Sequence, residues 1–130
     1  MSKDKNTIKI SYGAINVLWQ LINLMPTKNF EISNKIQMVG EAILDKKEYF
    51  DEMNETYNRT YRENPTMENQ KSIRELAKKL NETKTDIELD EKAVKFLGEN
   101  LEAVLTEHAK DIKGVVFAKY INEIKSIIKE

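Results

Sequence analysis

The chain has 130 residues, enough for one domain with a buried core, and its 21 Lys and Arg against 22 Asp and Glu leave a formal charge of -1. So small a net charge creates no overall field that attracts DNA, RNA or an anionic membrane, so neither nucleic acid nor a membrane is favoured as a partner. Cysteine is absent, which excludes disulfides, thiolate metal sites and thiol catalysis. The N-terminus lacks the apolar core of a signal peptide, and the longest apolar run, residues 14–25, is shorter than the ~20 residues of a membrane span. We therefore expect a single cytoplasmic domain over residues 1–130, with residues 1–6 frayed.

Two short segments alternate polar and apolar residues, as half-buried strands do. The first is TIKIS, residues 7–11, and the second is TDIEL, residues 85–89. A lone strand leaves its backbone groups unpaired, so we expect these two segments to pair with each other, with helices packed behind them. The free edge of such a sheet is a place where a partner chain could add a strand.

Helical spacing of apolar residues predicts three helices outside the centre of the chain. The first covers about residues 12–25, because Ser11 can cap it and Pro26 stops it. A fourth helix follows the cap residue Asp90, and a last helical segment covers residues 111–129. The sequence leaves open whether these last two segments are continuous.

The centre of the chain predicts a long antiparallel helical hairpin. Its first helix runs from residue 32 or 33 to about residue 62, and ~30 residues make a rod of about 45 Å, longer than a compact domain of this size requires. Pro65 ends that helix, and Thr66 caps a third helix that extends to about residue 80. The predicted fold is mainly α with a small two-stranded sheet (α+β), in which the first, fourth and last helices pack against the base of the hairpin.

An acidic face on the long helix is the nearest approach to a catalytic site. Glu48, Glu52 and Glu55 are spaced so that their carboxylates share one side of a helix, where they could hold Mg²⁺. Residues 51–55, DEMNE, resemble the first half of the motif of the all-α nucleotide pyrophosphohydrolases, which is two acids, a two-residue gap and a further Glu. The second half, a Glu followed three residues later by Asp on another helix, is absent. A solvated acidic face is the favoured interpretation, and a magnesium-dependent nucleotide hydrolase is the alternative.

Basic residues form a second series, on the third helix. Lys71, Arg74 and Lys78 recur at helical spacing and could contact phosphates, which makes a weak nucleic-acid binding module a further alternative. Acidic residues interleave with them, so we favour salt bridges to the acidic second helix across the hairpin. His108 is the only histidine, and we expect it to end the fourth helix or to lie in the core rather than to act as a general base.

Aromatic and methionine side chains gather on the hairpin. These residue types are enriched in protein interfaces, and a projecting hairpin has too few neighbours to bury all of them. The candidate interaction surface consists of Tyr49, Phe50, Met53, Tyr57, Tyr61 and Met67.

The order of these features resembles a family of small proteins of unknown function encoded by phages and prophages of Gram-positive bacteria. The resemblance covers about residues 7–94: a strand (TIKIS), a helix ending in LMP, a long charged helix, a shorter helix and the segment LNETKTDIEL. After Glu91 this chain departs from the family by adding two helical segments. The resemblance implies a phage context and a small accessory protein that works by binding, either to a phage component or to a host defence-system protein. It implies no catalytic residue and no cofactor. The leading hypothesis is a non-enzymatic protein-binding module that acts through the apolar and aromatic surface of the hairpin and forms homo-oligomers.

Overall fold

The computed structural model describes residues 5–27, 29–108 and 115–129. Its elements in chain order are β1 (Lys5–Ser11), α1 (Tyr12–Leu24), α2 (Phe30–Glu63), α3 (Met67–Glu82), β2 (Lys84–Asp90), α4 (Glu91–Glu107) and α5 (Val115–Lys129). The predicted fold class is confirmed, because the described residues form helices and one two-stranded antiparallel sheet. None of the helices described is long and apolar enough to cross a membrane.

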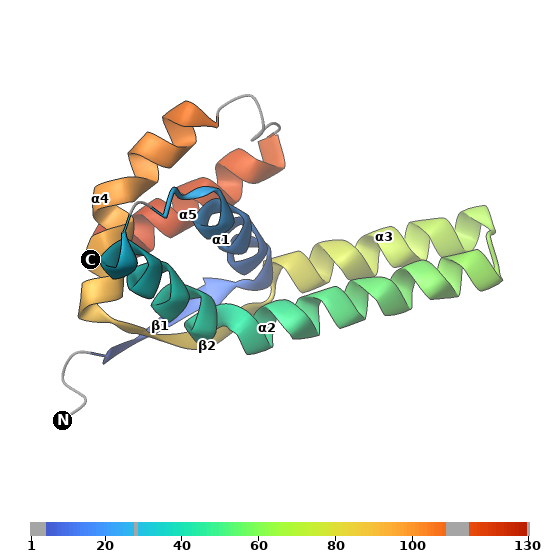
Figure 1. The fold of residues 1–130 in the computed structure, drawn as a ribbon. Helices are drawn as coiled ribbons and strands as arrows, with labels where there is room; N and C mark the ends of the chain where they lie inside the picture. The colour runs from blue at the N-terminus through green and yellow to red at the C-terminus, as the bar shows by residue number, and fades with distance from the viewer. Residues whose placement is uncertain (1–4, 28, 109–114, 130) are drawn as a thin grey trace.

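The molecule has two parts with different packing (Figure 1). A body contains the sheet, α1, α4, α5 and the first half of α2. The second half of α2 and most of α3 project from this body as a helical pair, as the length of the predicted hairpin required. We call residues 51–79 the arm.

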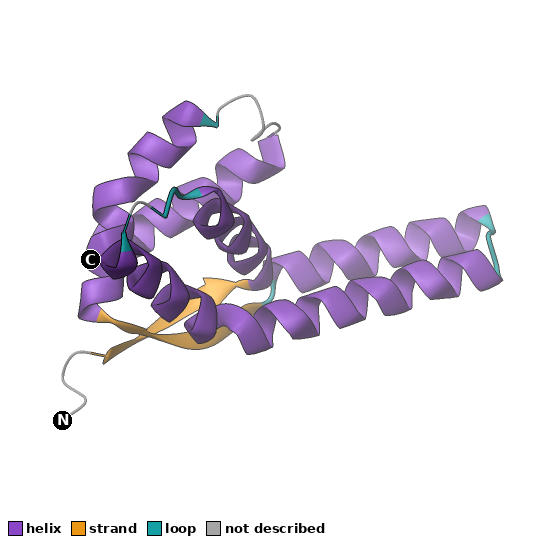
Figure 2. Ribbon diagram, viewed as in Figure 1, coloured by secondary structure: helices purple, strands orange, loops and turns teal. Residues whose placement is uncertain are grey.

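The predicted pairing of the two strands is confirmed. β1 and β2 are antiparallel with Ile8 opposite Ile87, and the helices of the body lie on one side of the sheet (Figure 2). Ile10, Ile87 and Leu89 are buried on that side, as alternation requires. The strands thus join the start of the chain to the segment that follows the hairpin.

Helix α1 lies at the centre of the body. It contacts α2, α3, α4, α5 and β1, and one long face of it is buried. The buried apolar side chains of this helix are Ala14, Ile15, Val17, Leu18, Leu21 and Ile22. The body therefore has one hydrophobic core built around its first helix.

The start of α1 is held by a side chain from the far end of the chain. The Ser11 N–H donates to Glu123 Oε2 at 2.7 Å, and the Ser11 hydroxyl donates to Glu123 Oε1 at 2.8 Å. The same hydroxyl accepts from the Ala14 N–H at 3.2 Å, which confirms Ser11 as the predicted cap. Glu123 thus ties α5 to the first turn of α1.

Predicted helix starts are confirmed at Thr66 and Asp90, whose side chains accept from the first-turn amides. The predicted start of α2 is wrong by a few residues. The Asn29 side chain accepts from the Ile32 N–H at 2.9 Å, so the helix begins at Phe30. Apolar periodicity could not show this, because the Phe30 side chain is exposed.

The last two helical segments, whose continuity the sequence left open, are separate helices. α4 ends at Glu107, where the backbone N–H of His108 donates to the Val104 carbonyl at 3.0 Å, and α5 is a separate helix. Residues 109–114, which include the start predicted for the last helix, lie outside the described residues.

The prediction that residues 1–6 are frayed is wrong for residues 5 and 6. Residues 1–4 lie outside the described residues, but Lys5 and Asn6 belong to β1 and are opposite Asp90 and Leu89.

Candidate protein-binding surfaces

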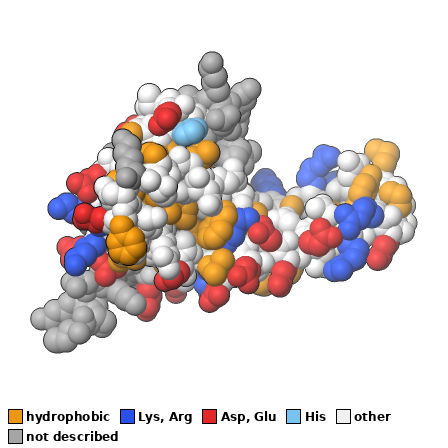
Figure 3. Space-filling view, viewed as in Figure 1, with side chains coloured by type: hydrophobic (Ala, Val, Ile, Leu, Met, Phe, Trp, Pro, Cys, Tyr) orange, Lys and Arg blue, Asp and Glu red, His pale blue; other side chains and the backbone are white. Residues whose placement is uncertain are grey.

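The arm is a helical pair without a buried core. Within the described residues of the arm, none between 51 and 79 is buried, whereas Phe50 and Leu80 at its base are. The two helices meet through half-buried side chains, which are Met53, Asn54, Tyr57 and Tyr61 of α2 with Asn69, Ile73 and Ala77 of α3. On the visible face of the arm, acidic and basic side chains are interspersed, and basic and hydrophobic side chains both lie towards the tip (Figure 3).

The structure separates the predicted interaction residues into groups. Met67 at the tip is 85% exposed and Tyr49 near the base is 46% exposed, so both present apolar surface to solvent. Met53, Tyr57 and Tyr61 are half-buried between the helices. Phe50 is only 6% exposed and therefore does not contribute to a surface; it belongs to the core.

An apolar groove of about 260 Å³ lies where the arm joins the body. Its floor includes Tyr12 and Tyr49, whose ring centroids are 5.3 Å apart at a tilt of 44°. Leu76, which is 46% exposed, and Tyr57 extend the groove onto the arm. We call this the aromatic groove; its lining is Tyr12, Tyr49, Tyr57, Leu76, Lys79, Leu80, Thr83 and Lys84. The sequence analysis found Tyr49 and Tyr57 but missed Tyr12 and Leu76, because only the fold brings α1 and α3 to this place.

The acidic face predicted as a metal site does not form a ligand cluster. Glu48, Glu52 and Glu55 are exposed along one helix. Glu55 Oε1 forms an ion pair with Arg62 Nη2 at 2.9 Å. Among the described residues, no group of three or more acidic or histidine side chains is close enough to hold a metal ion. Mg²⁺ requires converging carboxylate oxygens, and Glu48, Glu52 and Glu55 do not form such a group.

The basic series lies along α3, and its predicted salt bridges to α2 are absent. In the described part of the chain, no ion pair joins Lys71, Arg74 or Lys78 to an acidic side chain. The charged pairs on the arm side of α2 lie within that helix instead, between Lys47 and Asp51 and between Arg62 and Glu55.

Arg74 and Lys78 line a hollow of about 460 Å³ between α3 and α5. Tyr120 lies at its floor, and burial raises the pKa of the Tyr120 hydroxyl while neighbouring Lys119 opposes that shift. Lys119 also pairs with Glu82 at 3.5 Å, which partly neutralises the hollow. Lys71 is not part of the lining, so the three basic residues do not converge on one place.

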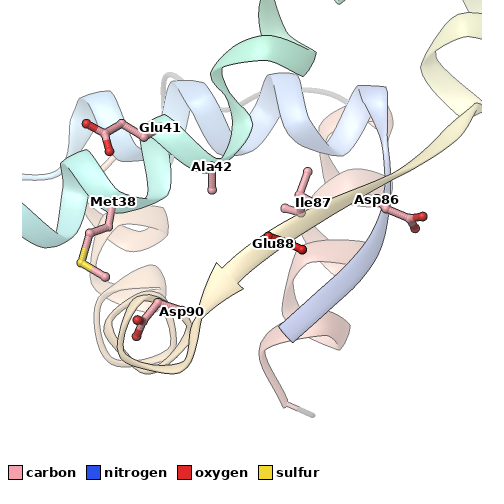
Figure 4. A pocket seen from close by; sticks show the side chains of 7 residues that line it. All are labelled: Met38, Glu41, Ala42, Asp86, Ile87, Glu88 and Asp90. Atoms are coloured by element: carbon pink, nitrogen blue, oxygen red, sulfur yellow. The ribbon is translucent and has the colours of Figure 1, made fainter. Parts of the chain in front are cut away.

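A second groove, of about 480 Å³, lies between α2 and β2. Figure 4 shows Met38 and Ala42 pointing from α2 towards the strand and Ile87 pointing from β2 towards the helix. Carboxylates line the rest of the groove, from Glu41, Asp86, Glu88 and Asp90. We call this the acidic groove. The alternation within residues 85–89 identified the strand but could not show that α2 runs beside Asp86 and Glu88.

Comparison of the chain with protein-family profiles, with curated proteins and with solved structures finds no match. Functional inference therefore depends on the surfaces described above.

Proposed function

We propose that this chain is a non-enzymatic, cytoplasmic protein-binding module that contacts its partner through the arm and the aromatic groove at its base. The observation that carries the proposal is the apolar surface that the hairpin exposes. The large apolar side chains of Tyr49, Leu76 and Met67 are exposed to solvent, and no described residue of the arm is buried. The partner class, a phage component or a host defence-system protein, rests on the resemblance in layout alone.

The energetics of the arm support a binding role. A pair of helices held by half-buried side chains gains little from apolar burial, and ordering its backbone costs roughly 1–2 kcal/mol per residue. The arm adds little to the core, because the hydrophobic cluster of the body packs around α1 and includes no described residue between 51 and 79. A partner that covers Tyr49 and Leu76 would supply the apolar burial that the arm lacks alone.

The aromatic groove has the composition of a binding site rather than of a solvated face. Tyrosine supplies a large apolar ring with a polar end, and it is enriched where proteins bind one another. Lys79 and Lys84 line the groove beside these rings, so a partner with an apolar side chain flanked by acidic residues fits it best.

The alternatives raised by the sequence have weaker support. Hydrolysis would need converging carboxylates, and Glu48, Glu52 and Glu55 lie apart along α2. Nucleic-acid binding would need a continuous basic surface, and Lys71 lies outside the hollow that Arg74 and Lys78 line.

The test is a quantitative pull-down from host lysate combined with light scattering of the purified chain. Light scattering shows whether a second copy is the partner. The double variant Tyr49→Ser/Leu76→Ser should lose most of the recovered partner, or dissociate an oligomer, because it removes both exposed apolar side chains of the groove. Its folded content by circular dichroism should stay close to that of the wild type.

A matched control changes side chains of the body, away from both the arm and the groove. The double variant Lys95→Ser/Glu99→Ser alters two exposed residues of α4 and should recover the same partner in the same amount. A monomeric wild-type protein that recovers no partner would refute the proposal. Equal recovery of the partner by both double variants would show that the aromatic groove is not part of the binding surface.

A further inference from the structure

The outer edge of β2 is an unpaired strand edge. In an antiparallel pair, residues opposite each other alternate between those that exchange both backbone hydrogen bonds and those whose N–H and C=O groups point away. The Tyr12 N–H donates to the Thr83 carbonyl at 3.0 Å, and the register then makes Ile10 with Thr85 and Ile8 with Ile87 the bonded pairs. The backbone groups of Asp86 and Glu88 must therefore point away from β1.

The opposite strand confirms this alternation independently. Ser11 lies one residue before Tyr12, so its N–H should point away from β2, and it donates to Glu123 Oε2 instead. β1 thus has a side-chain partner at its outer edge. On β2, among the described residues, no hydrogen bond is formed by the backbone N–H of Asp86 or Glu88.

The acidic groove runs along this open edge. Asp86, Ile87 and Glu88 are consecutive, and their side chains point alternately to the two faces of the sheet. One groove can meet all three only at the edge of the strand, and its described lining includes no β1 residue. Met38 and Ala42 of α2 form its other wall, as Figure 4 shows.

The charges of the groove select the occupant. Among the described residues, its lining carries Glu41, Asp86, Glu88 and Asp90 and no basic side chain. A second copy adding its own β2 would bring these carboxylates against their counterparts, and like charges opposite each other in a sheet are destabilising. A strand with basic side chains would instead meet them with opposite charge, and its apolar side chains could cover Ile87, Met38 and Ala42.

We propose that the outer edge of β2 binds a basic, extended segment of a partner protein, which adds to the sheet as a third strand. Backbone hydrogen bonds to Asp86 and Glu88 supply affinity that does not depend on sequence, and the carboxylates select a segment in which Lys or Arg alternates with apolar residues. This site is separate from the aromatic groove, and it does not depend on the function proposed for the arm.

The test uses a fluorescent synthetic peptide of alternating Lys and Val as the probe. Titration with the full chain should show saturable binding, and hydrogen exchange measured by NMR should slow at the amides of Asp86 and Glu88. A Glu and Val peptide of the same length should bind at least about tenfold more weakly, because its charges oppose those of the groove. The Lys and Val peptide with N-methyl groups on its pairing edge should also lose about tenfold, because it cannot donate to the strand.

Two protein variants with the same change in charge complete the test. Asp86→Asn/Glu88→Gln should weaken the probe several-fold, whereas Glu52→Gln/Glu63→Gln on the arm should leave binding unchanged. Tyr49→Ser/Leu76→Ser should also bind the probe as the wild type does.

Equal losses in the two charge variants, undiminished binding of the N-methylated peptide, or unchanged exchange at Asp86 and Glu88 would overturn the proposal. Slow exchange at these amides that depends on protein concentration without peptide would mean that a second copy is the occupant.

Discussion

The body and the arm use the same kinds of helices but hold them together differently. In the body, α1 is surrounded by five other elements, and large side chains such as Ile15, Leu18 and Leu97 are almost completely buried. In the arm, α2 and α3 pack mainly against each other, and the side chains between them remain half-exposed. The difference teaches that the sequence pattern of an amphipathic helix does not set how much is buried; the number of neighbouring elements does. Substitutions matched between the two parts can test this comparison.

The largest expected difference is between two leucine truncations. Leu97 is 1% exposed in the body and Leu76 is 46% exposed on the arm. Leu97→Ala should lower the free energy of unfolding by about 2–5 kcal/mol, because it leaves a cavity in a packed core. Leu76→Ala should cost less than about 1 kcal/mol, because water already reaches this side chain. Urea denaturation followed by circular dichroism measures both, and equal losses would mean that the arm is as tightly packed as the body.

A smaller difference is expected between two helix caps. Glu123→Ala should cost about 2 kcal/mol, because it leaves the buried Ser11 hydroxyl and N–H without a charged acceptor. Thr66→Ala at the tip of the arm removes one exposed capping bond and should cost about 1 kcal/mol.

Thermal melts of both cap variants check that Glu123→Ala loses more stability than Thr66→Ala. Because Glu123 ties α5 to α1, its loss should also speed hydrogen exchange in the first turn of α1, while Thr66→Ala should affect only the start of α3. A Glu123→Ala protein as stable as the wild type would show that the contact is not needed.

A third pair of substitutions compares two glycines of the body. A Cβ at Gly13 would lie closer to the Tyr120 ring than van der Waals contact allows, whereas a Cβ at Gly40 would meet Ile22 Cδ1 at an ordinary 3.6 Å. Gly13→Ala should therefore destabilise by about 1–3 kcal/mol through overpacking. Gly40→Ala should be neutral or should stabilise by up to about 1 kcal/mol, because alanine favours the helix. Shifts of the melting temperature in opposite directions would confirm the close contact of α1 with α5 at Gly13. A Gly13→Ala variant as stable as the wild type would contradict this contact.

Much of the fold could be predicted because its signals are local. Alternation at Ile8 and Ile10 and at Ile87 and Leu89 identified both strands, and the side chains of Ser11 and Thr66 marked two helix starts. The strand pairing followed from a general requirement, since two unpaired strands in one small domain satisfy each other. These inferences needed neighbours in the sequence and little else.

What the sequence could not show depends on the direction in which a helix face points. Cross-hairpin salt bridges were expected from Lys71 and Lys78, but Ile73 and Ala77 face α2 and leave the basic residues on the other sides of α3. Likewise the contact of Glu123 with Ser11 joins residues from the two ends of the chain. The candidate sites were found only in part for the same reason, because each groove is built from elements that are distant in sequence.

The strand pairing also has a consequence for how the chain folds. Ile10 lies opposite Thr85, so the sheet can form only when a long intervening segment has been closed into a loop, which costs conformational entropy before any contact rewards it. The hairpin has a short turn and local contacts. Once it forms, it brings Tyr49 and Leu80 to the same groove and removes the residues between them from that loop. A projecting element that adds little to the folded core would thus act early, by shortening the search that β1 and β2 must complete.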